Sequence, residues 1–139
     1  MAIVLADTSA LYALFDRKDQ NHQAAVQFYD QQLSFNTRFV VIEYVLVELM
    51  TLLRKRGYTA FAVQFRESLS TSQIFMLQYS SPEFEEETFR VFRSFVDKSW
   101  SYTDCALFVT AKHLGNVPVF SFDHHITQMG LIRLPREGA

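Results

Sequence analysis

Short apolar runs alternate with longer helical patterns along the chain, and this alternation constrains the fold more than any other feature of the sequence. The first run, residues 2–6, is rich in aliphatic side chains and has the length of a buried strand. Further strands are predicted at residues 38–42, 74–79, 117–122 and 131–134. Strands separated by helices favour a mostly parallel sheet covered on both faces. We therefore predict an α/β fold, a three-layer α/β/α sandwich with a sheet of about five strands.

The segments between these strands carry the apolar spacing of helices. Gly57 and Gly115 mark two helix ends, and Ser81 followed by Pro82 marks a helix start. Thr59 is expected to cap a further helix. The predicted helices begin near residue 8 and cover approximately residues 24–33, 43–56, 59–69, 82 onward and 101–114, with a short helix before the last strand.

Composition limits the possible classes of protein. The 139 residues suit one domain, residues 1–139, and 49% hydrophobic with 20% charged residues argues against disorder. A formal charge of -2 gives no global positive field, so any nucleic-acid site must be local. Cys105 is the only cysteine, which excludes an intramolecular disulfide and fits a reducing compartment, the cytoplasm. The N-terminal run is too short for a signal peptide or a membrane span.

The 14 phenylalanines recur mostly inside helical segments, so core packing is favoured over nucleotide stacking for nearly all of them. Phe61, Phe65 and Leu69 are spaced at i, i+4 and i+8 and form one apolar stripe. We expect this stripe to pack in the core, and a homodimer surface is the less favoured alternative.

Two aspartates follow apolar runs directly. Asp7 comes after the first predicted strand and Asp123 after the fourth. Ligands of open α/β sheets gather beyond the carboxyl ends of the strands, where both carboxylates are expected. For Asp7 a helix N-cap explains the residue equally well, because Asp is a common cap worth about 1 kcal/mol. Two acids at strand ends are harder to explain as caps than one.

Two further acids lie on predicted helices. Glu48 is the only charged residue between Glu43 and Arg54, with apolar residues at its helical neighbour positions. An unpaired carboxylate in an apolar face should reach a cation or turn toward water, and we favour the cation. Asp104 fits a capping box with Ser101, so a structural role alone would explain it.

Four carboxylates at one sheet edge would repel each other unless a divalent cation neutralised them, and oxygen ligands select Mg²⁺ or Mn²⁺. Such an ion supports phosphodiester hydrolysis. For His124 and His125 we favour turn or surface roles, since adjacent residues rarely aim at the same ion. The cations at residues 54–56 suit a helix C-terminus, which we favour over phosphate binding.

Four segments together resemble the PIN-domain family, in the family's order and over nearly the whole chain: residues 5–10 (LADTSA), 44–49 (YVLVEL), 101–106 (SYTDCA) and 121–125 (SFDHH). The similarity looks closest to the VapC-type ribonuclease toxins of toxin-antitoxin systems. One departure is Ile126, where many relatives carry an aromatic residue.

The resemblance implies that Asp7, Glu48, Asp104 and Asp123 are catalytic, metal-binding acids for Mg²⁺ or Mn²⁺, with Thr8 and Ser121 as polar supports. It further implies endonucleolytic cleavage of an RNA substrate, inhibition by a cognate antitoxin protein, and a homodimer.

Three alternative assignments make different demands on these residues. A haloacid-dehalogenase-like phosphatase needs a second aspartate two places after Asp7, where Ser9 stands. A response-regulator receiver needs an acidic pair near the first strand and a late lysine, and neither is found. A catalytically inactive PIN-fold binding module is disfavoured by the complete set of four acids, but this alternative stays open.

Overall fold

The computed structural model describes residues 2–137 and contains a five-stranded sheet in the order β3-β2-β1-β4-β5, with every neighbouring pair parallel. The prediction of a parallel α/β sheet is therefore confirmed. The strands are β1 (Ile3–Ala6), β2 (Arg38–Ile42), β3 (Phe75–Gln78), β4 (Val119–Phe120) and β5 (Arg133–Leu134).

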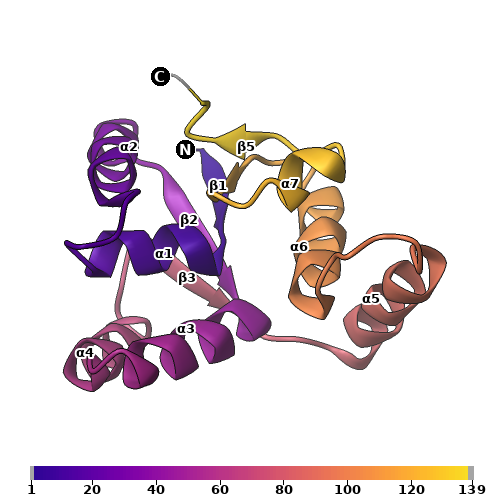
Figure 1. Ribbon diagram of the computed structural model, residues 1–139, viewed down its shortest axis with the longest axis horizontal. Helices are drawn as coiled ribbons and strands as arrows, with labels where there is room; N and C mark the ends of the chain where they lie inside the picture. Colours follow the sequence, from indigo (N-terminus) through magenta and orange to yellow (C-terminus); the bar gives the residue numbers. More distant parts are fainter. Residues whose placement is uncertain (1, 138–139) are drawn as a thin grey trace.

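Helices cover both faces of the sheet (Figure 1). From β1 the chain passes outward through β2 to β3, then crosses back beyond β1 to β4 and β5. Since parallel crossovers are right-handed, this reversal puts the first four helices on one face and the later helices on the other. The helices are α1 (Thr8–Phe15), α2 (His22–Ser34), α3 (Glu43–Lys55), α4 (Thr59–Ser68), α5 (Pro82–Ser94), α6 (Tyr102–His113) and α7 (His125–Gln128).

The register of the central strands brings the strand-end residues together. Leu5 pairs with Val119 and Ala6 with Phe120, so Asp7 and Ser121 leave the sheet side by side. The Asp7 N–H continues the ladder by donating to the Phe120 carbonyl oxygen at 2.9 Å. The reversal of strand order between β1 and β4 is the position where doubly wound sheets hold their ligands.

The predicted bounds of three elements are wrong. The last strand was expected over residues 131–134, but only Arg133 and Leu134 form β5. The fourth strand was expected over residues 117–122, but β4 comprises only Val119 and Phe120. The Ser121 N–H still donates to the Leu134 carbonyl oxygen at 3.0 Å, and the ladder ends there because the Phe122 N–H donates to the Ser9 hydroxyl instead. Thr59 is not a helix cap: it is the first residue of α4, and Tyr58 holds the cap position without a side-chain hydrogen bond.

The core occupies both faces of the sheet, and the part under the first helices is rich in aromatic side chains. Phe28 of α2 packs against Phe120 with ring centroids 4.8 Å apart, and Phe39 lies 5.7 Å from the same ring. Such pairs add to the hydrophobic gain of burial. The core is thus built around the strands that carry the strand-end acids.

The phenylalanine prediction holds only in part. Nine of the 14 rings are buried or pack against the core, whereas the rings of Phe35, Phe61, Phe89, Phe92 and Phe95 are exposed. In the predicted stripe, Phe65 and Leu69 are buried, and Phe61 lies at the edge, 6.3 Å from the ring of Phe15.

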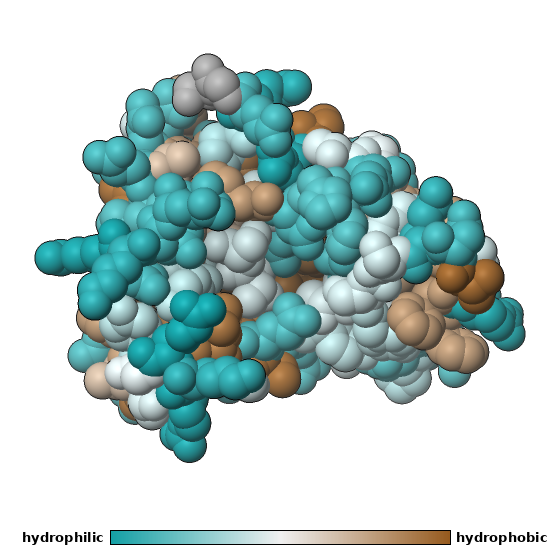
Figure 2. Space-filling model, in the orientation of Figure 1, coloured by the Kyte–Doolittle hydropathy of each residue, from teal (hydrophilic) through white to brown (hydrophobic). Residues whose placement is uncertain are grey.

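Polar side chains dominate the face in Figure 2, and apolar ones gather at the right edge, where Figure 1 places α5. Helix α5 packs against α6 and leaves Phe89 and Phe92 exposed. Among residues 2–137, no helix has the length and apolar character needed to cross a membrane.

Candidate metal centre

Asp7 is a buried carboxylate at the junction of β1 and α1. It holds the N-cap position of α1, as the capping alternative expected, and its Oδ1 accepts the Thr8 N–H at 2.7 Å. Its Oδ2 accepts the Ser121 hydroxyl at 2.7 Å and the Ser9 hydroxyl at 3.3 Å. Only 5% of the residue is exposed. The cap and the contacts across the sheet edge therefore coexist on one side chain.

The surroundings of Asp7 disfavour its negative charge. Burial raises the pKa of its carboxyl from 3.8 to about 6, and the nearby charges of Asp104 and Asp123 act in the same direction. The hydrogen bonds from Ser121 and from the Thr8 N–H lower this pKa, but they offset only part of the cost of burial. A cation next to Asp7 would favour the ionised form.

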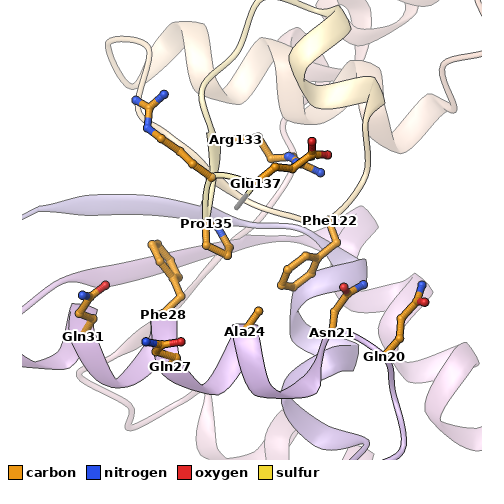
Figure 3. A pocket seen from close by; sticks show the side chains of 11 residues that line it. Gln20, Asn21, Ala24, Gln27, Phe28, Gln31, Phe122, Arg133, Pro135 and Glu137 are labelled. Atoms are coloured by element: carbon orange, nitrogen blue, oxygen red, sulfur yellow. Dashed lines mark hydrogen bonds and ion pairs between the residues drawn. The ribbon is translucent and has the colours of Figure 1, made fainter. Parts of the chain in front are cut away.

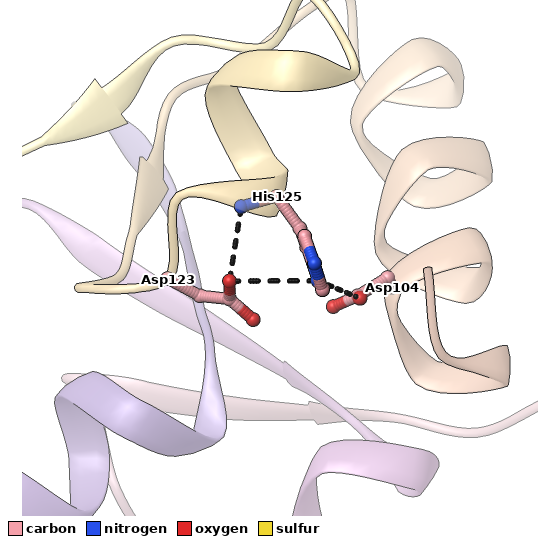
Figure 4. A group of neighbouring side chains, drawn as sticks. All are labelled: Asp104, Asp123 and His125. Atoms are coloured by element: carbon pink, nitrogen blue, oxygen red, sulfur yellow. Dashed lines mark hydrogen bonds and ion pairs between the residues drawn. The ribbon is translucent and has the colours of Figure 1, made fainter. Parts of the chain in front are cut away.

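Asp104 and Asp123 approach each other from opposite sides of His125 (Figure 4). Asp104 lies in the first turn of α6, and Asp123 lies in the loop between β4 and α7. The Nδ1 atom of His125 is 3.1 Å from Oδ2 of Asp104 and 3.6 Å from Oδ1 of Asp123. One ligand atom from each of the three residues lies within 4.8 Å of the others.

Asp104 also completes the predicted capping box. Its Oδ2 accepts the Ser101 N–H at 2.9 Å, while the Ser101 hydroxyl accepts the Asp104 N–H at 3.0 Å. Oδ1 of Asp123 accepts the His125 N–H at 2.9 Å. These bonds within residues 2–137 use one oxygen of each aspartate, so the other oxygen of each can take a further ligand.

Glu48 lies on α3, and its two oxygens bridge the elements that carry the buried aspartates. Oε1 accepts the Thr8 hydroxyl at 2.8 Å and Oε2 accepts the Thr103 hydroxyl at 2.9 Å. Thr8 and Thr103 are the sequence neighbours of Asp7 and Asp104. The expectation that Glu48 stands in an apolar face is wrong, because the residue is exposed and its carboxylate faces the hydroxyls of Thr8 and Thr103.

Serine hydroxyls fix the relative positions of these acids. Ser121 is fully buried, donates to Asp7 and accepts the Asp123 N–H at 2.9 Å. Ser9 accepts the Phe122 N–H at 3.0 Å. Because each hydroxyl donates and accepts, the two serines connect the end of β1 to the loop after β4. This network holds Asp7 and Asp123 at the same edge of the sheet.

The described residues suit a hard divalent cation. Asp104 and Asp123 supply carboxylate oxygens, the ligands that Mg²⁺ and Mn²⁺ prefer, and His125 supplies a nitrogen that Mn²⁺ also accepts. The Asp7 carboxyl is near enough to feel the charges of both aspartates. Burial is the main cause of the raised pKa of Asp7, and the charges of Asp104 and Asp123 add to it. Both the chemistry of the donors and their charge therefore fit a bound metal ion.

The four acids predicted from the sequence lie at one site, although not all of them contact each other directly. Asp104 and Asp123 come together, Asp7 joins them through Ser121, and Glu48 joins through Thr8 and Thr103. Sequence reasoning missed His125 at the centre, since it favoured a turn or surface role. His124 fits that role, with its side chain 73% exposed.

Arg56 follows α3 at the C-cap, with its guanidinium 5.6 Å from the centre of the Tyr12 ring. Arg54 and Lys55 occupy the last turn of the same helix. These positions agree with the favoured interpretation of the cations as partners of the helix end.

Comparison with known proteins places these features in context. A family model described as the PIN domain matches residues 4–131. The fold is similar to a Mycobacterium tuberculosis structure, the VapC20 toxin that cleaves the sarcin-ricin loop, with 20% identity, a TM-score of 0.82, and coverage of 94% of this chain and 97% of that one. PAE2754 from Pyrobaculum aerophilum is 19% identical, with a TM-score of 0.62 and coverage of 95% and 83%. No curated protein matches the sequence.

Proposed function

Since this chain belongs to the PIN-domain family, we propose that it is a metal-dependent endoribonuclease that hydrolyses RNA phosphodiester bonds. The observation that carries the proposal is the convergence of Asp104 and Asp123 beside a buried Asp7 whose carboxyl resists ionisation. A carboxylate that only caps a helix does not require other carboxylates close to it. Carboxylates crowded at a sheet edge are suited to hold a divalent cation.

The roles of the residues follow from their contacts. Asp7, Asp104, Asp123 and Glu48 are the residues that would hold Mg²⁺ or Mn²⁺, and such an ion supplies an activated water and stabilises the leaving oxygen when bound. Ser121 orients Asp7 and the backbone of Asp123 through its two hydrogen bonds. His125 is held against the two aspartates.

The charge of the site also explains why a cation is needed. An RNA phosphate is negative and would be repelled by Asp104 and Asp123, and the chain as a whole carries a charge of -2. Among the described residues no lysine or arginine forms an ion pair with these four acids. Binding of the substrate therefore depends on neutralisation of the acids.

We further propose that the protein is the toxin of a toxin-antitoxin pair and that a cognate antitoxin protein is its partner. The fold similarity to the VapC20 toxin over nearly the full length of both chains supports this assignment. We also propose that residues 1–139 form a single domain and that the protein forms a homodimer. A PIN-fold module without activity is the alternative, and the full set of acids favours the enzyme.

Purified protein incubated with RNA tests the proposed activity. We expect internal cleavage with Mg²⁺ or Mn²⁺ and none in excess chelator, because the acids alone cannot bind the phosphate. Cleavage that continues at full rate in chelator would refute the metal mechanism. No cleavage of any RNA by the folded, metal-loaded protein would favour the inactive module.

The Glu48→Gln variant tests whether Glu48 takes part in cleavage or is only a surface acid. The amide keeps the shape of the side chain and can still bond to Thr8 and Thr103, but the charge is lost. We expect cleavage to fall at least tenfold with an unchanged circular dichroism spectrum. Glu67→Gln is the matched control, since Glu67 is also an exposed helical glutamate. Equal activity of both variants would remove Glu48 from the site.

A further inference from the structure

A pocket of about 440 Å³ opens between α2 on one side and Phe122 with residues 133–137 on the other (Figure 3). Its apolar lining includes Phe28, Pro135 and Phe122, and Figure 3 shows the Phe122 ring beside Pro135 and directed toward α2. Phe28 and Phe122 both pack on Phe120, with ring centroids 4.8 and 6.3 Å from it. The pocket therefore has a rigid aromatic floor.

This pocket is joined directly to the candidate metal centre. Phe122 lies between Ser121 and Asp123, so its Cα is about 3.8 Å from that of a proposed metal ligand. Its N–H donates to the Ser9 hydroxyl, which also contacts Asp7. The side chains of Ser121 and Phe122 point to opposite sides of this turn, toward Asp7 and toward α2. One turn thus forms the border of both sites.

Amide side chains border the aromatic floor. Asn21 lies before the first turn of α2, and Gln27 and Gln31 project from α2 into solvent at successive turns. An amide offers both donors and acceptors, the combination presented by the edges of nucleobases. Neither a carboxylate ligand nor a purely apolar ligand would use both kinds of group.

The positive charge of the pocket is modest. Arg133 forms an ion pair with Glu137 at 3.0 Å, whereas the side chain of Arg136 is exposed at the rim. Among residues 2–137 Arg136 forms no ion pair, and such a cation beside an aromatic floor suits a base with its attached phosphate. Single-stranded RNA is recognised in this way, by stacking of an unpaired base on aromatic rings and by hydrogen bonds to its edge.

We propose that this pocket binds one nucleobase of the RNA strand, a neighbour of the phosphodiester held at the acids. The inference rests on the proposed function, which it extends by assigning the position where the enzyme selects its sequence. Phe122 supplies the stacking surface, and the amide of Asn21, which Figure 3 shows beside Phe122, contacts the edge of the base.

Titration of isotopically labelled protein with AMP, CMP, GMP and UMP, each in excess chelator, tests the pocket without any need for activity. Ribose 5-phosphate, which lacks the base, is the control compound. We expect at least one nucleotide to shift the backbone amide NMR signals of Ala24, Gln27 and Phe122, and ribose 5-phosphate to leave them unchanged. Equal shifts with ribose 5-phosphate would indicate a phosphate site only and would overturn the proposal, as would the absence of shifts.

Ala24→Leu is the matched variant, because Ala24 is an exposed helical residue that lines the pocket. Leucine is well tolerated in helices, so the fold should persist while the larger side chain fills the pocket. We expect nucleotide affinity to fall roughly tenfold, which is within the range for loss of one base stack. Ala60→Leu, at an exposed position on α4, should keep the wild-type affinity. Equal affinity in both variants would overturn the proposal.

Cleavage of RNA by the same variants separates this proposal from the proposed function. Altered sequence preference beside the cut in Ala24→Leu, with Ala60→Leu unchanged, supports the pocket. Nucleotide binding at Phe122 without any RNA cleavage would keep the pocket and refute the nuclease. Cleavage with the same preference in Ala24→Leu and wild type would keep the nuclease and refute the pocket.

Discussion

Replacing Asp7 with asparagine should stabilise the metal-free protein. The folded-state pKa of Asp7 is raised to about 6, so the folded protein resists the ionisation that the unfolded chain undergoes near 3.8. Between these two pH values the folded state binds more protons than the unfolded state. The contribution of the Asp7 carboxyl to the free energy of unfolding therefore falls as the pH rises. Above pH 6 the full cost of the buried charge is present, and asparagine removes it.

The size of the effect follows from the pKa difference. A shift of about two pKa units corresponds to roughly 3 kcal/mol, which sets the upper limit for the gain. Asparagine still accepts the Thr8 N–H, but its NH₂ group replaces the oxygen that accepts from Ser121 and Ser9, which reduces the gain. We expect about 1–2 kcal/mol at pH 8, a rise in melting temperature of roughly 3–7 °C for a chain of this length.

Thermal melts of wild type and Asp7→Asn in chelator at pH 4, 6 and 8 measure this difference. The advantage of the variant should be largest at pH 8 and should vanish near pH 4, where the wild-type carboxyl is protonated in the folded state. Asp97→Asn is the control, since the Asp97 side chain is 71% exposed, and it should change little at any pH. A variant no more stable than wild type at pH 8, or an advantage independent of pH, would refute the reasoning.

Other outcomes follow from the same geometry. His125→Ala should slow single-turnover RNA cleavage by tenfold or more, because His125 contacts two proposed ligands, whereas His124→Ala should not; equal rates would contradict this. Ser121→Ala should cost about 1–3 kcal/mol in urea unfolding, because it leaves the Asp123 N–H without its acceptor; an unchanged midpoint would argue against the network. A single domain should unfold in one transition, identical by circular dichroism and Trp100 fluorescence; two separate transitions would contradict it.

The central strands were predictable because both their faces are buried. Parallel strands of this kind appear as continuous apolar runs, and the predicted bounds of β2 agree with the structure. The fourth strand was predicted too long, because Phe122 is apolar although its N–H bonds to the Ser9 hydroxyl and not to a neighbouring strand. An apolar pattern indicates which side chains are buried, but it does not indicate where the backbone hydrogen bonds of a strand end.

The acids were identifiable from their positions, but their surroundings were not. Asp7 caps α1 and is also linked to Asp123 through Ser121, and Asp104 belongs to both a capping box and the acidic cluster, so the two interpretations of each residue are not exclusive. Glu48 is exposed although its helical neighbours Val45 and Leu49 are buried, because its side chain extends from α3 toward Thr8 and Thr103. The approach of His125 to Asp104 depends on how α7 packs beside α6, a tertiary contact that no local pattern encodes.

The central claim is that the carboxylates share one divalent cation, and metal-induced stabilisation tests it most directly. Thermal melts of wild type, Asp104→Asn, Asp123→Asn and the control Asp97→Asn are recorded in chelator and in Mn²⁺. An ion at one hundred times its Kd adds about 2.7 kcal/mol to the stability of the folded state. We predict a rise of several degrees for wild type and Asp97→Asn, and a much smaller rise for the other two variants. Equal rises in all four proteins would contradict a shared cation.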